Sequence, residues 1–218
     1  MIATDLFAGM GAPSQGAAPL AEGAMLLRGF AVAEASDLMS ALKEVLAAAP
    51  FHHMLTPGGH RMSVAMSNCG PLGWVTDRRG YRYVERDPET ERPWPAMPTG
   101  FAALAARSAD AAGFGPFFPD CCLINRYHPG ARMALHQDRD ERDFAQPIVS
   151  VSLGLPARFL FGGLSRREPS LSIRLEHGDV VVWGGPMRLA FHGIAALADG
   201  VHPLTGSARI NLTFRKAG

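Results

Sequence analysis

The sequence predicts a mainly β chain with supporting helices, an α+β protein whose core is a jelly-roll. Short strand-like runs separated by turn residues follow one another after Pro119, and two helical patterns precede them. The length of 218 residues suits one domain of this class. We therefore expect a single domain over residues 1–218, with the jelly-roll core over residues 119–216.

The N-terminal part of the chain predicts an extension followed by one helix. Residues 8–24 are rich in Gly, Ala and Pro and lack apolar periodicity, which predicts a flexible arm or a loop packed over the domain. From residue 34 to residue 49 apolar side chains recur at helical spacing, and Pro50 ends the run. The apolar positions of this helix are Leu38, Leu42, Val45, Leu46 and Ala49.

Residues 51–98 mix Gly, Pro, Met and aromatic residues with a basic segment, and they show no long period. We expect short strands and loops there that form a lid. A second helix follows, with Thr99 as its cap and Gly113 as its left-handed stop. One face of this helix carries Phe101, Leu104, Ala105, Ser108 and Ala112.

The strands of the predicted core are short and closely spaced. The turn residues His177, Gly178 and Asp179 separate two of the runs, which predicts a hairpin turn in which His177 and Asp179 have structural roles. The expected strands cover residues 121–127, 148–155, 159–161, 171–176, 180–183 and 209–215.

Composition and charge set limits on location and partners. The net charge of +1 means that an anionic partner must be held by a local basic patch. The three cysteines form an odd set without metal-type spacing, which indicates a reducing compartment. No apolar run approaches the roughly 20 residues that span a bilayer, and no charged leader with a following apolar run opens the sequence, so we expect a cytoplasmic protein without membrane contact.

The stretch from residue 135 to residue 140 carries the first candidate metal ligands. If this segment is extended, His136, Asp138 and Asp140 project from one face. Sites with two histidines and one carboxylate leave coordination positions open on Fe(II), as oxygen chemistry requires, but the third ligand must come from elsewhere. A solvated strand or turn is the alternative interpretation.

The last predicted strand has one apolar face and one face with two arginines. Arg209, Asn211, Thr213 and Arg215 alternate with apolar residues. If the polar face points into a barrel, two buried guanidinium groups require an anion, and a dicarboxylate suits their forked geometry. The alternative is a surface strand with a solvated polar side.

Two polar residues on an upstream strand have the same alternation. Asn125 and Tyr127 share a face, so they either add hydrogen bonds to the same ligand or are ordinary polar residues of a strand.

His192 is the preferred third metal ligand. It lies between apolar neighbours on an expected strand, directly before a glycine, whereas a core histidine is the alternative. The order His136-x-Asp138, then His192, then Arg209 and Arg215 resembles the Fe(II)/2-oxoglutarate-dependent oxygenases, which use 2-oxoglutarate and O2 as cosubstrates with Fe(II). The other histidines lie in turn-like or lid-like segments: His52, His53, His60, His128, His177 and His202.

Longer motifs make the resemblance more specific. From about residue 5 to residue 215 the chain resembles the AlkB family of oxidative DNA dealkylation-repair enzymes, which implies a double-stranded β-helix (jelly-roll) core, an N-terminal extension and a nucleotide-recognition lid over residues 51–98. The matching segments are residues 56–59, 62–70, 125–127, 136–141, 147–154, 161–164, 177–185 and 209–215.

The resemblance implies a role for each matching residue. It implies that Fe(II) is held by the catalytic residues His136, Asp138 and His192, and that 2-oxoglutarate is held by Asn125, Tyr127, Arg209, Asn211 and Arg215. It also implies that the damaged base stacks between Trp74 and His136, surrounded by Thr56, Met66, Tyr81, Asp140 and Arg166.

The activity implied by the resemblance is the direct repair of 1-methyladenine and 3-methylcytosine by oxidative dealkylation, in which 2-oxoglutarate and O2 yield succinate and CO2 and the lesion releases formaldehyde. The expected substrate is alkylated single-stranded DNA, with double-stranded DNA also accepted and RNA left open, and the expected state is a monomer. The alternatives are an oxygenase acting on a protein, a lipid or a small metabolite, a catalytically silent jelly-roll that binds nucleic acid, and a zinc hydrolase.

Overall fold

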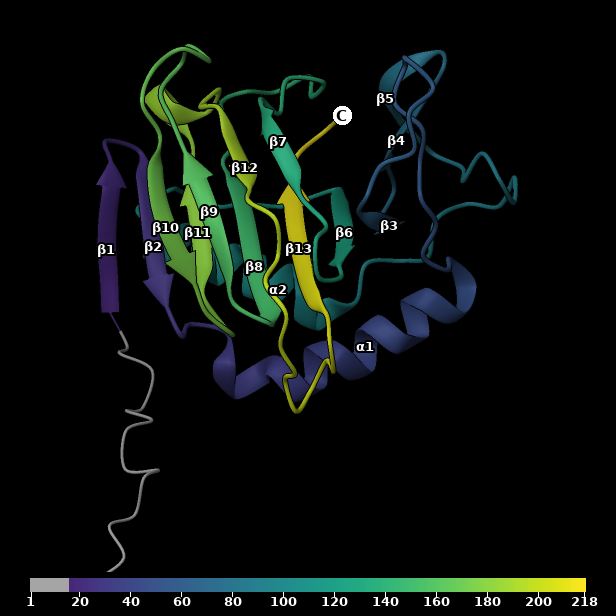
Figure 1. Cartoon of the computed structure of the whole chain (residues 1–218), viewed down its shortest axis with the longest axis horizontal. Coiled ribbons are helices and arrows are strands. Elements are labelled where there is room, and N and C mark those ends of the chain that lie inside the picture. The colour runs from purple at the N-terminus through teal and green to yellow at the C-terminus, as the bar shows by residue number, and fades with distance from the viewer. Residues whose placement is uncertain (1–15) are drawn as a thin grey trace, which may run out of the picture.

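The computed structural model describes residues 16–218 as two facing antiparallel sheets, two helices and a separate hairpin (Figure 1). This confirms the predicted jelly-roll with supporting helices. The larger sheet has seven strands in the order β1-β2-β11-β8-β13-β6-β3. These strands are β1 (Gly16–Ala21), β2 (Ala24–Arg28), β11 (Val180–Trp183), β8 (Ile148–Gly154), β13 (Arg209–Arg215), β6 (Cys121–Tyr127) and β3 (Ala65–Cys69).

The smaller sheet has four strands in the order β10-β9-β12-β7. An apolar cluster with Phe159, Phe161 and Trp183 at its centre fills part of the space between the two sheets. The strands of the smaller sheet are β10 (Leu171–Leu175), β9 (Ala157–Phe161), β12 (His192–Ile194) and β7 (Met133–His136).

The helices α1 (Ala35–Ala48) and α2 (Thr99–Ala111) cover the other face of the larger sheet, as Figure 1 shows. Both helices bury a stripe of apolar residues three and four positions apart, which is the pattern that their sequences predict. The strands β8, β11 and β13 therefore lie between two apolar layers, and every residue of these strands is buried. On β13 the alternate residues Ile210, Leu212 and Phe214 face the helices, so its polar residues face the smaller sheet.

The hairpin of β4 (Gly73–Asp77) and β5 (Gly80–Val84) forms a sheet of its own. It contacts β6 and β3 at the edge of the larger sheet, and in Figure 1 it lies next to the C-terminus and across from the end of β7. Short 3-10 turns at Val32–Glu34 and Gly185–Met187 complete the described elements. Neither helix has the length and hydrophobicity that a membrane span needs.

Two local expectations in the first half of the chain were wrong. Residues 16–24 are not an arm or a loop, because Gly16–Ala21 and Ala24–Arg28 pair as β1 and β2 and extend the larger sheet, whereas residues 8–15 lie outside the described residues. Thr99 does not cap α2: Pro98 occupies the N-cap position, and Thr99 is the first helical residue. Gly113, with a φ of 82°, does form the left-handed stop of this helix.

The turn at residues 177–179 is present, but it does not close a hairpin. The strands on either side of it, β10 and β11, belong to different sheets, so the turn carries the chain from one layer to the other. Gly178 adopts a φ of 83°, and a Cβ atom there would lie 2.3 Å from Val32 Cγ2. Asp179 has the predicted structural role, because its carboxylate accepts hydrogen bonds from the backbone N–H groups of Gly29 and Glu176 and pairs with Arg28.

Candidate active site

Two neighbouring strands of the smaller sheet bring the predicted metal ligands together. His136 ends β7, His192 opens β12, and these two residues are direct partners in the antiparallel pair, with ring centroids 4.4 Å apart. Asp138 follows β7 by two residues and turns inward. The ligand atoms of the three side chains lie within 4.8 Å of one another, and no other such group of His, Cys, Asp and Glu occurs in residues 16–218.

Backbone contacts set the tautomer of both histidines. His136 Nδ1 lies 2.9 Å from the carbonyl oxygen of Ala134, and His192 Nδ1 lies 3.0 Å from that of Ala190. A carbonyl oxygen only accepts hydrogen bonds, so in the neutral rings Nδ1 carries the proton. The lone pair of each ring is then on Nε2, which faces Asp138 at 3.7 Å in both cases and is free to bind a metal ion.

The surroundings of Asp138 and His192 favour the protonation states that a metal ion needs. Burial alone would raise the pKa of Asp138, but the charge of Arg215, followed by His192 and His136, holds it well below its usual range. Burial, together with the neighbouring His136, lowers the pKa of His192 to about 4. At neutral pH the site therefore presents one carboxylate and a neutral His192.

A small cavity of about 50 Å³ lies between the sheets beside these ligands. All five predicted cosubstrate residues line it, together with His136 and His192. Arg209 is fully buried there. Its Nη2 donates to Ser152 Oγ at 3.0 Å, but its Nε and Nη1 atoms have no partner among the described residues. Burial lowers the pKa of this guanidinium group, which is the sign of a cation that lacks a compensating anion.

The remaining cosubstrate residues are placed by neighbouring strands. Asn211 Nδ2 donates to Ser150 Oγ at 2.8 Å, and the Tyr127 ring lies beneath the Arg209 guanidinium group, 5.1 Å from Cζ to the ring centroid. Arg215 differs from Arg209, because its Nε and Nη2 atoms donate to Asp138 Oδ2 at 2.9 and 2.7 Å. Arg209 thus has two donor atoms, Nε and Nη1, available to a ligand, whereas Arg215 orients the Asp138 carboxylate and has only Nη1 without a partner among the described residues.

These residues fit Fe(II) and 2-oxoglutarate. Three convergent donor atoms of the two-His-one-carboxylate type and an adjacent buried cation with unsatisfied N–H groups are what an iron ion and a bound dicarboxylate require.

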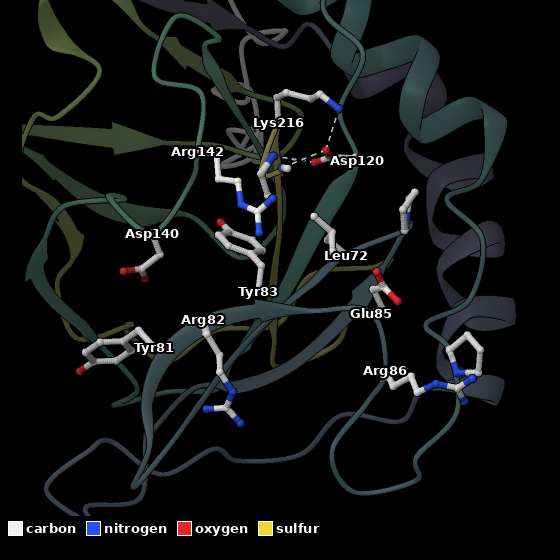
Figure 2. A pocket seen from close by; sticks show the side chains of 14 residues that line it. Leu72, Tyr81, Arg82, Tyr83, Glu85, Arg86, Asp120, Asp140, Arg142 and Lys216 are labelled. Carbon is white, nitrogen blue, oxygen red and sulfur yellow. Dashed lines mark hydrogen bonds and ion pairs between the residues drawn. The ribbon is translucent and has the colours of Figure 1, made fainter.

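Three of the predicted substrate residues meet at the mouth of the site. Trp74 on β4 stacks on Tyr81 on β5, with centroids 5.6 Å apart and an interplanar angle of 18°. Trp74 Nε1 donates to Asp140 Oδ2 at 3.1 Å. Tyr81 and Asp140 lie at one end of a wide groove that runs between the hairpin and the C-terminus (Figure 2).

The other three predicted substrate residues lie on separate elements. Met66, on β3, is buried in the apolar cluster against which Trp74 packs. Thr56 lies in the turn over residues 56–59, and Arg166 lies in the loop between β9 and β10, with its guanidinium group 5.1 Å from the ring centroid of Phe191.

The segment after β7 does not continue as a strand, so the condition under which His136, Asp138 and Asp140 would share one face is not met. Asp138 turns inward to Arg215, whereas Asp140 is exposed and faces Trp74. The two carboxylates are therefore separated by environment rather than aligned on one face.

Sequence reasoning missed a second buried acid, Glu141, and its partners Tyr83 and Arg188. Glu141 pairs with Arg188 at 3.2 Å and accepts a hydrogen bond from Tyr83 Oη at 2.5 Å. The only sequence signal for Glu141 was its position next to Asp140, and the sequence around Arg188 shows no motif or periodicity. Trp183 was also missed: it lines the cavity, and its indole Nε1 is buried without a partner in the described part of the chain.

Comparison with known proteins agrees with this geometry. The family model described as the 2OG-Fe(II) oxygenase superfamily matches residues 23–215. The alpha-ketoglutarate-dependent dioxygenase AlkB of Escherichia coli is 59% identical over 200 residues, which cover 92% of this chain and 93% of that protein. AlkB of Salmonella typhimurium is 58% identical over 199 residues, covering 91% and 92%.

More distant proteins share part of the chain or its fold. The nucleic acid dioxygenase ALKBH1 of Mus musculus is 32% identical over 123 residues, covering 56% of this chain and 31% of that protein. The solved structure of OsALKBH1 superposes with a TM-score of 0.82 at 27% identity, covering 92% of this chain and all of that one. The chain therefore belongs to the 2OG-Fe(II) oxygenase superfamily and, within it, to the AlkB family of alpha-ketoglutarate-dependent dioxygenases.

Proposed function

We propose that this dioxygenase repairs alkylated nucleic-acid bases by oxidative dealkylation, with 1-methyladenine and 3-methylcytosine as substrates. The observation that carries the proposal is the Trp74–Asp140 contact at the mouth of the site, two residues along the chain from the metal ligand Asp138. An aromatic face held beside a carboxylate favours a flat, positively charged ligand over a neutral one.

The interior residues divide into two groups in this proposal. His136, Asp138 and His192 hold Fe(II), and Arg209 neutralises the far carboxylate of 2-oxoglutarate with hydrogen bonds from the residues around it. When bound, Fe(II) with 2-oxoglutarate and O2 supplies the oxidation of the alkyl carbon, and the hydroxylated alkyl group then leaves the base as formaldehyde. The further cosubstrate residues are Asn125, Tyr127, Asn211 and Arg215.

The proposed lesion site explains the choice of base. Methylation at N1 of adenine or N3 of cytosine gives the base a positive charge and blocks its pairing edge, so the damaged base leaves the duplex more readily. Trp74 and His136 stack on the base, Asp140 faces its charge, and residues 51–98 act as the nucleotide-recognition lid. Thr56, Met66, Tyr81 and Arg166 complete the surroundings of the base.

The substrate form follows from the same reasoning. A base in single-stranded DNA needs no unpairing, so we propose alkylated single-stranded DNA as the preferred substrate, with double-stranded DNA also accepted. Names of relatives support nucleic acid more broadly, since they include a nucleic acid dioxygenase and a tRNA demethylase. RNA is therefore included as a candidate substrate, and we propose that a monomer performs the reaction.

The direct test uses purified protein with Fe(II), ascorbate and 2-oxoglutarate, and an oligonucleotide with one 1-methyladenine in single-stranded and in duplex form. We expect formaldehyde and restored adenine in equal amounts, with faster repair of the single strand. Turnover of 2-oxoglutarate without base repair would contradict the proposal. Failure of alkylated single-stranded DNA to compete with another substrate would then favour an oxygenase acting on a protein, a lipid or a metabolite.

A further inference from the structure

A buried set of charges connects the hairpin β4–β5 to the metal ligand Asp138. Arg215 lies at its centre, because its Nε and Nη2 atoms donate to Asp138 while its Nε also lies 3.4 Å from Glu141 Oε1. Arg188 Nη2 lies 3.2 Å from Glu141 Oε2. All four side chains are buried, and two carboxylates face two guanidinium groups.

Tyr83 on β5 connects the hairpin to this set. Its hydroxyl donates to Glu141 Oε1 at 2.5 Å, and burial raises the pKa of Tyr83, so the phenol keeps its proton. In Figure 2 the Tyr83 ring projects from the hairpin with its hydroxyl directed toward the segment that carries Asp140 and Arg142. The hairpin thus contacts this segment through two adjacent acids, Asp140 through Trp74 and Glu141 through Tyr83.

The two contacts have different surroundings. The Trp74–Asp140 contact is exposed at the mouth, where a base would enter. Glu141 is buried, and its side-chain partners are Tyr83, Arg188 and Arg215. Arg188 fixes the same segment from the other side, because its Nη1 donates to the backbone oxygen of Asp138 at 2.8 Å and its Nε donates to that of Gln146 at 3.0 Å.

We infer that Glu141 and Tyr83 are positioning residues that couple the docking of the hairpin to the orientation of Asp138 through Arg215. Arg215 is shared between Asp138 and Glu141, so a change in the charge or position of Glu141 changes how tightly Arg215 holds the Asp138 carboxylate. Partners of metal ligands tune metal affinity in this way. The inference rests on the proposed function, because it assigns Asp138 to the metal and the hairpin to the substrate.

The coupling is reciprocal, which makes it measurable without nucleic acid. Binding of Mn(II) and 2-oxoglutarate in the wild-type protein should slow the amide exchange of residues 80–84. Glu141→Gln should weaken Mn(II) binding about tenfold. In this variant, metal binding should no longer slow the amide exchange of residues 80–84. Tyr83→Phe removes one hydroxyl and leaves the buried charges in place, so it should lose the hairpin protection with a smaller change in metal affinity.

Asp77→Asn is the matched control on the same hairpin. Asp77 holds the tip of the hairpin through Arg79 and Arg82, and none of its hydrogen bonds or ion pairs within residues 16–218 involves Glu141. Asp77→Asn should therefore loosen residues 77–79 and leave Mn(II) affinity and the protection of residues 80–84 by metal unchanged. The double variant Tyr83→Phe/Glu141→Gln should lose no more hairpin protection than Glu141→Gln alone, because both substitutions act on the same Tyr83–Glu141 contact.

Mn(II) affinity within about twofold of the wild type in Glu141→Gln, where a loss of about tenfold is expected, would overturn the inference. Equal loss of hairpin protection in Asp77→Asn would also overturn it. If Glu141→Gln does not fold, Tyr83→Phe tests the coupling by itself. Amide exchange of residues 80–84 that still slows on metal loading in Tyr83→Phe would contradict the coupling. These measurements use no base lesion, so a failed repair assay with intact coupling would contradict only the proposed function.

Discussion

At the scale of single residues, two carboxylates two positions apart have opposite environments. Asp138 is buried against Arg215 and faces both metal-binding imidazoles, whereas Asp140 is exposed and contacts Trp74. Neither role follows from residue type. The two carboxylates differ in environment because β7 ends at His136, and the residues that follow are free to turn in different directions.

Asp140 should determine selectivity for charged lesions. We expect Asp140→Ala to lower kcat/KM for 1-methyladenine roughly tenfold, since it removes one charge near a cationic base. The neutral lesion 3-methylthymine is the matched substrate control and should lose much less. Comparison of kcat/KM on the two oligonucleotides provides the measurement, and an equal loss on both would show that Asp140 does not recognise charge. Asp138→Ala, in contrast, should abolish turnover of every lesion.

Arg209 should determine the affinity for 2-oxoglutarate. A lysine keeps the charge but loses the forked pair of donors, so Arg209→Lys should raise the KM for 2-oxoglutarate at least about tenfold with a smaller change in kcat. Steady-state assays with varied 2-oxoglutarate test this. Arg126→Lys is the control, because Arg126 lies on β6 over the ring of Phe51, away from the cavity. An unchanged KM in Arg209→Lys would remove Arg209 from the cosubstrate site.

At the scale of elements, the close approach of β7 and β12 positions two metal ligands. His136 and His192 are paired residues of these strands, and Gly193 lies against the backbone of residues 133–135. A Cβ atom at Gly193 would lie 2.6 Å from the backbone oxygen of Met133, with no flexible side chain to move away. The glycine is therefore required by the strand spacing that brings the imidazoles together.

Gly193→Ala should separate the strands and weaken the metal site. We expect a loss of about 1–3 kcal/mol in stability from overpacking and a roughly tenfold weaker Mn(II) affinity. Thermal unfolding and metal titration measure the two effects. Gly100→Ala in α2 is the control, since a Cβ atom at Gly100 meets no atom within 4 Å, and this change should leave both properties intact or raise stability slightly. Wild-type metal affinity in Gly193→Ala would show that the strand spacing does not govern the site.

At the scale of the whole molecule, the larger sheet separates two apolar layers. The cluster between the sheets surrounds the cavity, and the cluster beneath the helices stabilises the sheet from behind. The buried polar residues of β13 face the cavity, and among the buried arginines of residues 16–218 Arg209 is the one without an ion pair, so a bound anion would supply its missing partner.

Ligand binding should therefore stabilise the entire domain. At about 100 times the dissociation constant, Mn(II) with 2-oxoglutarate should add about 2.7 kcal/mol to the free energy of unfolding, which raises Tm by roughly 5–10 °C for a chain of this size. Differential scanning calorimetry measures this shift, and a chelator should reverse it. Asp138→Ala should show no shift with the metal, and a wild-type Tm unaffected by both ligands would contradict the site.

The sequence by itself determined the class of fold, both helices, most core strands and the residues that meet at the metal. These features follow from local alternation and from motifs such as His136-x-Asp138 and the arginines of β13, which keep their spacing wherever the strands are placed. Only the tertiary structure decided the rest. The pairing of β2 with β11, the separation of β10 from β11 into two sheets, and the contact of Glu141 with Tyr83 and Arg215 depend on which parts of the chain become neighbours. No local pattern encodes such contacts, because they depend on which strands become neighbours and which charges are sealed from water together.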